Sequence, residues 1–338
     1  VAAVVAASVG ESAEAVVREA AAGLHGKETQ LGAAAEGFAE EVPADAERAV
    51  FTVTLPHGLH ARPAARLVTE VKRFDATVQI RNVTTSSGYA PAASLSRVAA
   101  IGARQGHDIE AVASGRQSRA ALDAILGLAT RGFGEQTPPQ PPVLPMAGGG
   151  PLPASPGIGI GPKWAVGGGE VAVPDASAVA KPEQEWRSLL AAIAATRGDI
   201  TAARARLLHT GDEQSAAIFD AHLLLLDDVD IIEEVRAGID RGAAAAAAWK
   251  TALRRVEADW AQLDDPYMKA RAADVRAVSN QVLRQLFGTS EEVTSRRGIL
   301  VAADLTPNDI AHLDTGLVAG IVTTHGSPTS HAAILARA

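Results

Sequence analysis

The chain has 338 residues, with 31 Lys and Arg against 39 Asp and Glu, a net charge of −8 and no cysteine. At roughly 100–200 residues per domain, this length predicts two or three domains. The acidic balance argues against nucleic acid and anionic membranes as partners, and the missing cysteine excludes disulfides, thiolate metal sites and a cysteine nucleophile. Because no apolar stretch reaches the roughly 20 residues of a membrane span, we expect no membrane insertion and a cytoplasmic protein.

Proline and glycine mark the main boundary. The segment 134–153 has seven prolines and four glycines in twenty positions, which no helix or central strand tolerates. It predicts an extended linker between two halves. A softer polar boundary at 26–46 sets off a short N-terminal piece.

The segment 48–133 shows alternating strand and helix periods. A short predicted strand is followed by apolar residues at helical spacing. Apolar and polar residues then alternate every two positions, as in a strand. The expected elements are strands at 51–55, 77–81, 87–92 and 108–113 and helices at 61–74, 94–104 and 117–130. This order, βαββαβα, predicts an α+β open-faced sandwich with helices on one face of an antiparallel sheet.

The segment 154–338 reads as an α/β region interrupted by helices. Short strands with glycine turns are expected at 158–173, and Gly157 to Gly161 is interpreted as a turn rather than a dinucleotide motif because no helix follows. Three or four antiparallel helices are predicted over 182–288, with breaks near Gly211, Gly238 and Pro266. After Arg297 the α/β pattern returns, with a final helix from about Ser330.

Two histidines stand at predicted helix starts after small-residue turns. His60 is followed by Arg62 and Pro63, so its imidazole is expected beside unpaired helix N–H groups and a fixed cation. His331 follows Thr329 and Ser330, which supply hydroxyls for helix capping or phosphate binding. A neutral imidazole in an anion site can accept a phosphoryl group. The alternative for either histidine is a helix-capping or surface role.

The remaining histidines give weaker signals. His57 and His60 could form a metal pair only with a third ligand that nothing nearby supplies. His222 precedes four leucines on a predicted helix and is interpreted as a core or interface residue rather than a ligand. No metal site is predicted.

The strings GLHARPAA and SLSRVAAIGARQGHDIEAVASG closely resemble HPr, the phosphocarrier of the bacterial sugar phosphotransferase system, over about 50–131. The resemblance implies that His60 is the phosphorylated histidine, that Arg62 is its charge partner, and that Ala61 and Leu95 lie on the partner-binding face. Ser94 stands where some HPr proteins carry a regulatory phosphoserine. A helix N-cap role explains this serine without regulation.

The string TSHAAILAR resembles the phosphohistidine domain of Enzyme I, and further matches cover nearly all of 154–338. By this resemblance His331 is a phosphohistidine and the helices at 182–288 dock HPr, with Leu223 and Leu224 on the docking face. Ile310 stands where Enzyme I commonly has a threonine near its active histidine. The chain ends seven residues after His331, so we expect a truncated phosphohistidine domain without the phosphoenolpyruvate-binding barrel. No cofactor is expected in this chain, and phosphoenolpyruvate and Mg²⁺ are expected only on a complete Enzyme I.

The layout resembles the DhaM type of multiphosphoryl transfer protein, and 1–46 resembles the end of the mannose-type enzyme IIA domain that precedes HPr there. This implies a phosphotransferase subunit that passes phosphate from Enzyme I and HPr toward the ADP-binding subunit of dihydroxyacetone kinase. The start at Val1 rather than Met suggests a piece of a longer protein. Alternatives are a fructose-type multiphosphoryl transfer protein, an Enzyme I/HPr fusion for sugar uptake, or a regulatory docking module that is read by phosphorylation.

Overall fold

The computed structural model of the chain describes most residues from 46 onward. The described residues are 43, 46–135, 152–166, 171–173, 181–209, 213–289, 295–326, 328 and 330–337. The predicted end of an enzyme IIA domain and nearly all of the predicted linker therefore lie outside the described residues. Within the described part, no helix has the length and apolar character to cross a membrane.

The first unit has the predicted order βαββαβα. Its elements are β1 (Glu47–Thr52), α3 (Ala61–Val71), β2 (Thr77–Asn82), β3 (Ala90–Pro91), α4 (Leu95–Ala100), β4 (Asp108–Ser114) and α5 (Ser118–Thr130). The four strands form an antiparallel sheet in the order β1-β4-β2-β3. A short 3-10 helix (Gly132–Gly134) follows α5 and buries Phe133 against Phe51, with ring centroids 6.0 Å apart. The α+β sandwich expected from periodicity is confirmed.

The second unit is a small parallel sheet with a helical insertion. Strand β5 (Lys163–Val166) pairs with β6 (Gly298–Ala302), which pairs with β7 (Val318–Thr323). Helix α12 (Pro307–Ala311) lies between the last two strands, and α13 (His331–Arg337) follows β7. The inserted helices are α6 (Pro182–His209), α7 (Glu213–Leu226), α8 (Val229–Asp240), α9 (Ala245–Ala261), α10 (Pro266–Ala270) and α11 (Ala272–Phe287).

The described residues of the insertion thus form six helices rather than the predicted three or four. The break predicted near Gly238 is wrong, because Gly238 lies inside α8. A Cβ there would lie 3.2 Å from the Cβ of Ala248, so glycine permits close approach of α9. The chain turns instead at Gly242, whose φ of +95° suits glycine. The break expected near Gly211 lies outside the described residues.

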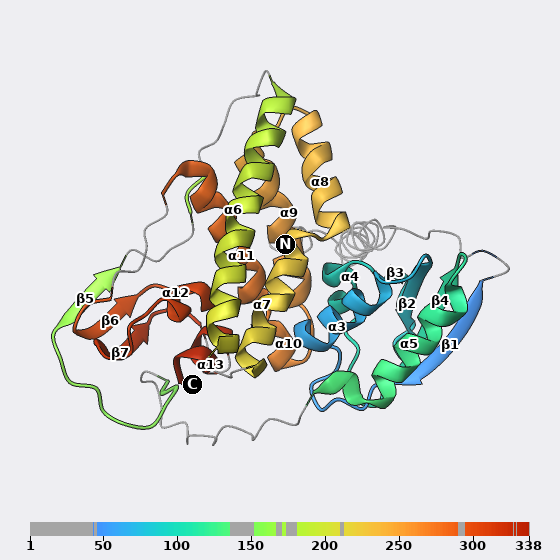
Figure 1. Cartoon of the computed structure of the whole chain (residues 1–338), viewed down its shortest axis with the longest axis horizontal. Helices are drawn as coiled ribbons and strands as arrows, with labels where there is room; N and C mark the ends of the chain where they lie inside the picture. The colour runs from blue at the N-terminus through green and yellow to red at the C-terminus, as the bar shows by residue number, and fades with distance from the viewer. Residues whose placement is uncertain are drawn as a thin grey trace, which may run out of the picture.

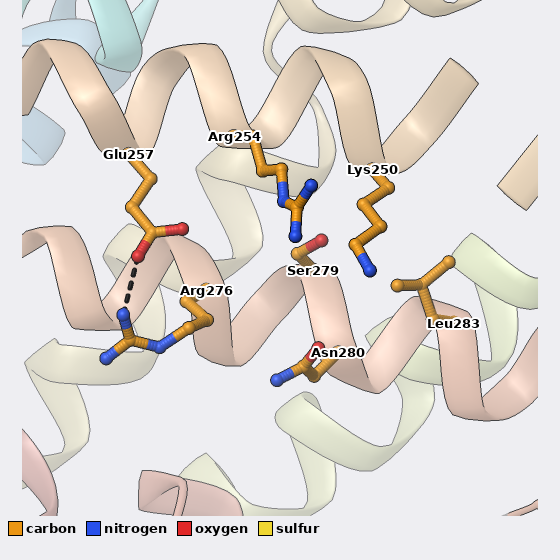
Figure 2. Close-up of a pocket in the computed structure, with 7 residues that line it drawn as sticks. All are labelled: Lys250, Arg254, Glu257, Arg276, Ser279, Asn280 and Leu283. Carbon is orange, nitrogen blue, oxygen red and sulfur yellow. Dashed lines mark hydrogen bonds and ion pairs between the residues drawn. The ribbon is translucent and has the colours of Figure 1, made fainter. Parts of the chain in front are cut away.

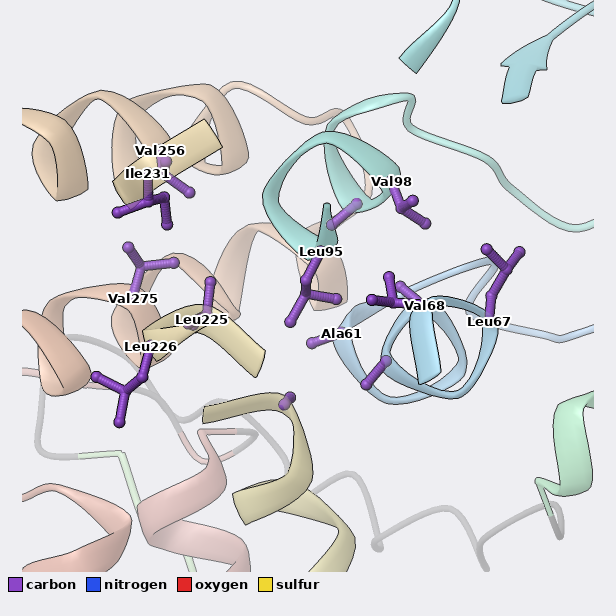
Figure 3. Packing of buried hydrophobic residues seen from close by; sticks show 14 of the residues in the cluster. Ala61, Leu67, Val68, Leu95, Val98, Leu225, Leu226, Ile231, Val256 and Val275 are labelled. Carbon is purple, nitrogen blue, oxygen red and sulfur yellow. The ribbon is translucent and has the colours of Figure 1, made fainter. Parts of the chain in front are cut away.

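The two units pack against each other through α3 and α4 of the first and the helices of the second (Figure 1). In Figure 3, Leu95 of α4 points toward Leu225 of α7, and Ala61 lies beside them. All three side chains are buried and belong to one continuous hydrophobic cluster. Leu223 and Leu224, predicted on the docking face, are half-buried and pack against the same cluster.

Candidate functional site

His60 is placed by a tight turn at the start of α3. Gly58 has φ +67°, and a Cβ on it would lie 2.0 Å from the carbonyl oxygen of Ala103, so only glycine fits. His60 is then the extended N-cap residue, and its carbonyl accepts the first helical hydrogen bond, from Ala64 at 3.0 Å. The side chain is 2% exposed. The turn therefore delivers a buried imidazole to the helix start, as the sequence predicts.

A carboxylate holds one ring nitrogen of His60. Nε2 lies 3.1 Å from Oε2 of Glu135, and the other oxygen of Glu135 lies 3.8 Å from Nε of Arg62. Burial lowers the pKa of His60, which Glu135 partly offsets and the charges of Arg62 and Arg271 reinforce. The imidazole is therefore biased toward the neutral form, which has a lone pair for a phosphoryl group. Arg62 is 13% exposed, so it is not the exposed surface charge that its position suggests.

His331 begins α13 and meets a carboxylate from α11. Oδ2 of Asp274 lies 2.9 Å from Nδ1 of His331, and Nη1 of Arg271 lies 3.7 Å from the same oxygen. On the other side of the carboxylate, Nε2 of His222 lies 3.8 Å from Oδ1. The charge of Asp274 favours a proton on Nδ1 of His331. The lone pair is then on Nε2.

The electrostatics of this cluster are set by burial. Desolvation lowers the pKa of His331 to about 3, opposed by the charge of Asp274 and reinforced by Arg271. Desolvation would raise the pKa of Asp274, but His331 and Arg271 together hold it well below its usual range. At neutral pH the cluster therefore contains a neutral His331, an ionised Asp274 and a guanidinium.

Arg271 connects the two histidine sites. Its side chain is 1% exposed, and its positive charge acts on both His60 and His331. It comes from the N-cap position of α11, three residues before Asp274. Packing of the two units thus places both candidate phosphohistidines around one buried cation.

A polar contact between the units lies at Asp228, the N-cap residue of α8. Its carboxylate is fully buried and accepts hydrogen bonds from the Ser94 hydroxyl at 3.0 Å and the Ser96 backbone N–H at 2.8 Å. Ser94 is itself the N-cap of α4. Nearby, the indole N–H of Trp260 donates to the Ser96 carbonyl at 3.2 Å. Burial raises the pKa of Asp228, and the bonds from Ser96 and Ser94 oppose that rise.

Of the two hydroxyl residues predicted to bind phosphate near His331, the structure describes only Ser330. Ser330 precedes α13, and its Oγ accepts a hydrogen bond from the Ala333 N–H at 3.2 Å. This bond is typical of a helix cap. Thr329 lies outside the described residues. Ile310, which replaces the family's threonine, is half-buried in the hydrophobic cluster, while Asp274 stands next to Nδ1 of His331.

Sequence reasoning missed the carboxylates and the shared cation. Glu135 falls within the predicted linker, and Asp274 and Arg271 look like ordinary polar residues of a helix. His222 was interpreted as a core residue, and it is indeed 1% exposed, but it faces Asp274. The one available signal was the helical spacing of Arg271 and Asp274, three residues apart, which puts them on one face.

The best-defined pocket lies elsewhere. It occupies about 250 Å³ between α9 and α11 (Figure 2) and carries several cationic groups, of which Arg276 pairs with Glu257 at 2.6 Å. None of its lining residues is a histidine. His60 and His331, the two candidate nucleophiles, therefore do not line this pocket.

Comparison with known proteins agrees with both units. Family models match 47–131 as "PTS HPr component phosphorylation site", 152–271 as "PEP-utilising enzyme, N-terminal" and 294–338 as "PEP-utilising enzyme, mobile domain". An NMR structure titled as Enzyme I (nEIt) is 31% identical over 54% of this chain and 76% of its own, with a TM-score of 0.45.

Two relatives extend across both units. A multiphosphoryl transfer protein of Xanthomonas campestris is 33% identical over 86% of this chain, which spans only 36% of that relative's length. The phosphoryl donor subunit DhaM of the PEP-dependent dihydroxyacetone kinase of Escherichia coli is 30% identical over 99% of this chain and 70% of its own length. With an HPr unit, an Enzyme I-like unit and this extended similarity, the chain belongs to the DhaM family of phosphotransferase-system proteins.

Proposed function

We propose that the chain is a phosphohistidine relay in which a phosphoryl group passes between His331 and His60, as part of a phosphoryl donor subunit for dihydroxyacetone phosphorylation. The observation that carries the proposal is the pair of buried histidines at helix starts that both lie within the field of the Arg271 charge. Enzyme I and HPr of the phosphotransferase system and a dihydroxyacetone kinase subunit are the proposed partners.

The transfer needs no net movement of protons. With the phosphoryl group on Nε2 of His331, Nδ1 keeps its proton beside Asp274. The lone pair on Nδ1 of neutral His60 attacks phosphorus, the new N–P bond forms, and the bond to Nε2 of His331 breaks. The proton on Nε2 of His60 stays with Glu135, 3.1 Å away. Each ring thus keeps one protonated and one reactive nitrogen.

Arg271 would stabilise the group in transit. A phosphoryl group in transfer between the two rings carries negative charge and loses its contact with water. The buried guanidinium of Arg271 is already in place and compensates that charge without moving. Arg62 supplies a second cation on the His60 side. Phosphoenolpyruvate and Mg²⁺ are assigned to a complete Enzyme I, which would supply the phosphoryl group to this chain.

The test uses two full-length variants. A His331→Ala chain is phosphorylated on His60 by phosphoenolpyruvate and complete Enzyme I, purified, and mixed with a His60→Ala chain. Mass spectrometry under alkaline conditions then locates phosphohistidine. We expect label on His331 of the acceptor. No label on His60 in the first step, or none on His331 in the second, would contradict the proposal.

A further inference from the structure

Three potential metal ligands, one of them His331, come from three helices and lie close together. His222 of α7, Asp274 of α11 and His331 of α13 each direct one ligand atom to a common point, and these atoms lie within 4.8 Å of one another. The side chains are 1%, 5% and 2% exposed. Unlike a surface acidic cluster, this group is enclosed and combines two imidazoles with one carboxylate.

The hydrogen bonding of the cluster is incomplete. Neither ring nitrogen of His222 or His331 has a hydrogen bond of good geometry, and Oδ2 of Asp274 has none either. Oδ2 of Asp274 and Nδ1 of His331 lie 2.9 Å apart as an ion-pair contact. Buried polar atoms without partners are costly. A single cation at their centre would satisfy all three side chains.

We propose that His222, Asp274 and His331 form a binding site for Zn²⁺ or a similar transition-metal ion. Two imidazole nitrogens, one carboxylate oxygen and an open fourth position are a ligand set that zinc uses in proteins. Magnesium and calcium prefer all-oxygen ligands, so the two imidazoles select against them. Arg271, 3.7 Å from Oδ2 of Asp274, opposes a second cation. We therefore expect micromolar rather than nanomolar affinity.

Bound zinc would switch the reactive nitrogen of His331, a consequence that rests on the proposed function. A neutral imidazole has one N–H and one lone pair. Beside Asp274 alone, the proton is on Nδ1 and the lone pair on Nε2. A Zn²⁺ ion that takes the lone pair of Nδ1 leaves the proton on Nε2, which then cannot attack phosphorus. Zinc bound at Nδ1 therefore blocks the attack of His331 Nε2 on phosphorus.

The first test measures metal binding without any phosphoryl transfer. Full-length wild-type chain is titrated with Co²⁺ and then Zn²⁺, with visible absorption as the readout. We expect one equivalent of Co²⁺ to give the intense bands of a tetrahedral site and Zn²⁺ to remove them. His222→Ala and His222→Gln should weaken binding at least tenfold, whereas His312→Ala, at an exposed histidine, should leave it unchanged. Absence of tetrahedral bands in the wild type would overturn the proposal, as would equal binding by a folded His222 variant.

The second test measures the consequence. A purified His331→Ala donor with phosphate on His60 is mixed with a His60→Ala acceptor, with and without one equivalent of Zn²⁺. We expect zinc to slow labelling of His331 at least tenfold, and the ratio of rates to approach one when the acceptor also carries His222→Gln. If zinc binds but leaves the rate unchanged, the tautomer switch is wrong. If His331 is not labelled even without zinc, the proposed function fails while the binding result stands.

Discussion

Each histidine site pairs a buried imidazole with a carboxylate, but the carboxylate lies beside a different ring nitrogen in each site. His60 has a carboxylate at Nε2, and His331 has one at Nδ1. Both rings are nearly fully buried, and both sense the charge of Arg271. If each carboxylate keeps the proton on the ring nitrogen beside it, the proposed function uses Nδ1 of His60 and Nε2 of His331.

The carboxylates differ in how firmly the fold holds them. Asp274 lies in the first turn of the long helix α11 and touches Arg271 and His222 as well. Glu135 directly follows a three-residue 3-10 helix and lies 3.1 Å from His60 and 3.8 Å from Arg62. A phosphoryl group on His60 would repel Glu135, and this short helix holds its carboxylate less firmly than α11 holds Asp274. We infer that Asp274 orients its ring throughout the cycle and that Glu135 does so only in the unphosphorylated state.

The largest effect is expected from Asp274→Asn. The carboxamide of asparagine can donate an N–H to Nδ1, which fixes the ring proton on Nε2, so nearly all of His331 presents the wrong nitrogen. We expect labelling of His331 by a phosphorylated donor chain to slow on the order of 10³-fold, comparable to neutralising the carboxylate that orients a catalytic histidine elsewhere. Rapid-quench kinetics measure the rate. Asp199→Asn on the exposed side of α6 is the control, and equal rates in the two variants would refute a positioning role.

The second effect is expected from Ser94→Asp at the boundary between the units. A second carboxylate beside the buried Asp228 places two like charges in a desolvated site, and an uncompensated buried charge costs about 3–5 kcal/mol. We expect the units to separate, with a larger radius of gyration by X-ray scattering and greater acrylamide quenching of the Trp260 fluorescence. Ser86→Asp, at an exposed position with φ 55°, is the control. An unchanged radius of gyration would show that this contact does not hold the units together.

The third effect is a pH dependence of stability. Above about pH 6.5 the His331 imidazole is neutral in both folded and unfolded chains; below this value the unfolded chain binds a proton that the folded chain rejects until about pH 3. Stability therefore falls with falling pH in this window, by up to about 1.4 kcal/mol per pH unit. The free energy of unfolding, measured by urea denaturation at several pH values, should change less steeply with pH in His331→Asn than in the wild type. Equal slopes would argue that His331 is protonated in the folded chain.

The smallest effect is expected from Glu135→Gln. The amide oxygen of glutamine still accepts the hydrogen bond from Nε2 of His60, and it does not repel a phosphoryl group. We expect labelling of His60 by Enzyme I to change by less than about tenfold, with the equilibrium shifted toward phospho-His60. Quantitative mass spectrometry of both forms measures the shift. A loss as large as that of Asp274→Asn would mean that the two carboxylates have the same role.

Much of the fold was predictable because each helix and strand of the first unit shows the spacing of apolar residues typical of its type and is bounded by turn residues. Both histidines were predicted as sites because each stands at a predicted helix start within a segment that resembles a phosphohistidine domain, and their phosphorylation stays a prediction. The helix count was wrong because the chain also breaks at Asp228 and at Arg271, the N-cap residues of α8 and α11, where no glycine or proline marks the break. The partners of the histidines were not predictable, since Asp274 and Glu135 reach them only through tertiary packing. The spacing of Arg271 and Asp274 indicates a shared helix face but not what packs against it.

The burial of both rings also bears on the loss of phosphate to water. A phosphohistidine bond is hydrolysed when a water molecule reaches phosphorus, and each unprofitable hydrolysis discards one phosphoenolpyruvate. In the packed arrangement His60 and His331 are each only 2% exposed. Under the proposed function, we therefore expect a phosphoryl group on either ring to be hydrolysed more slowly while the units stay packed together than after they separate. Spontaneous release of inorganic phosphate should then occur mainly after they separate.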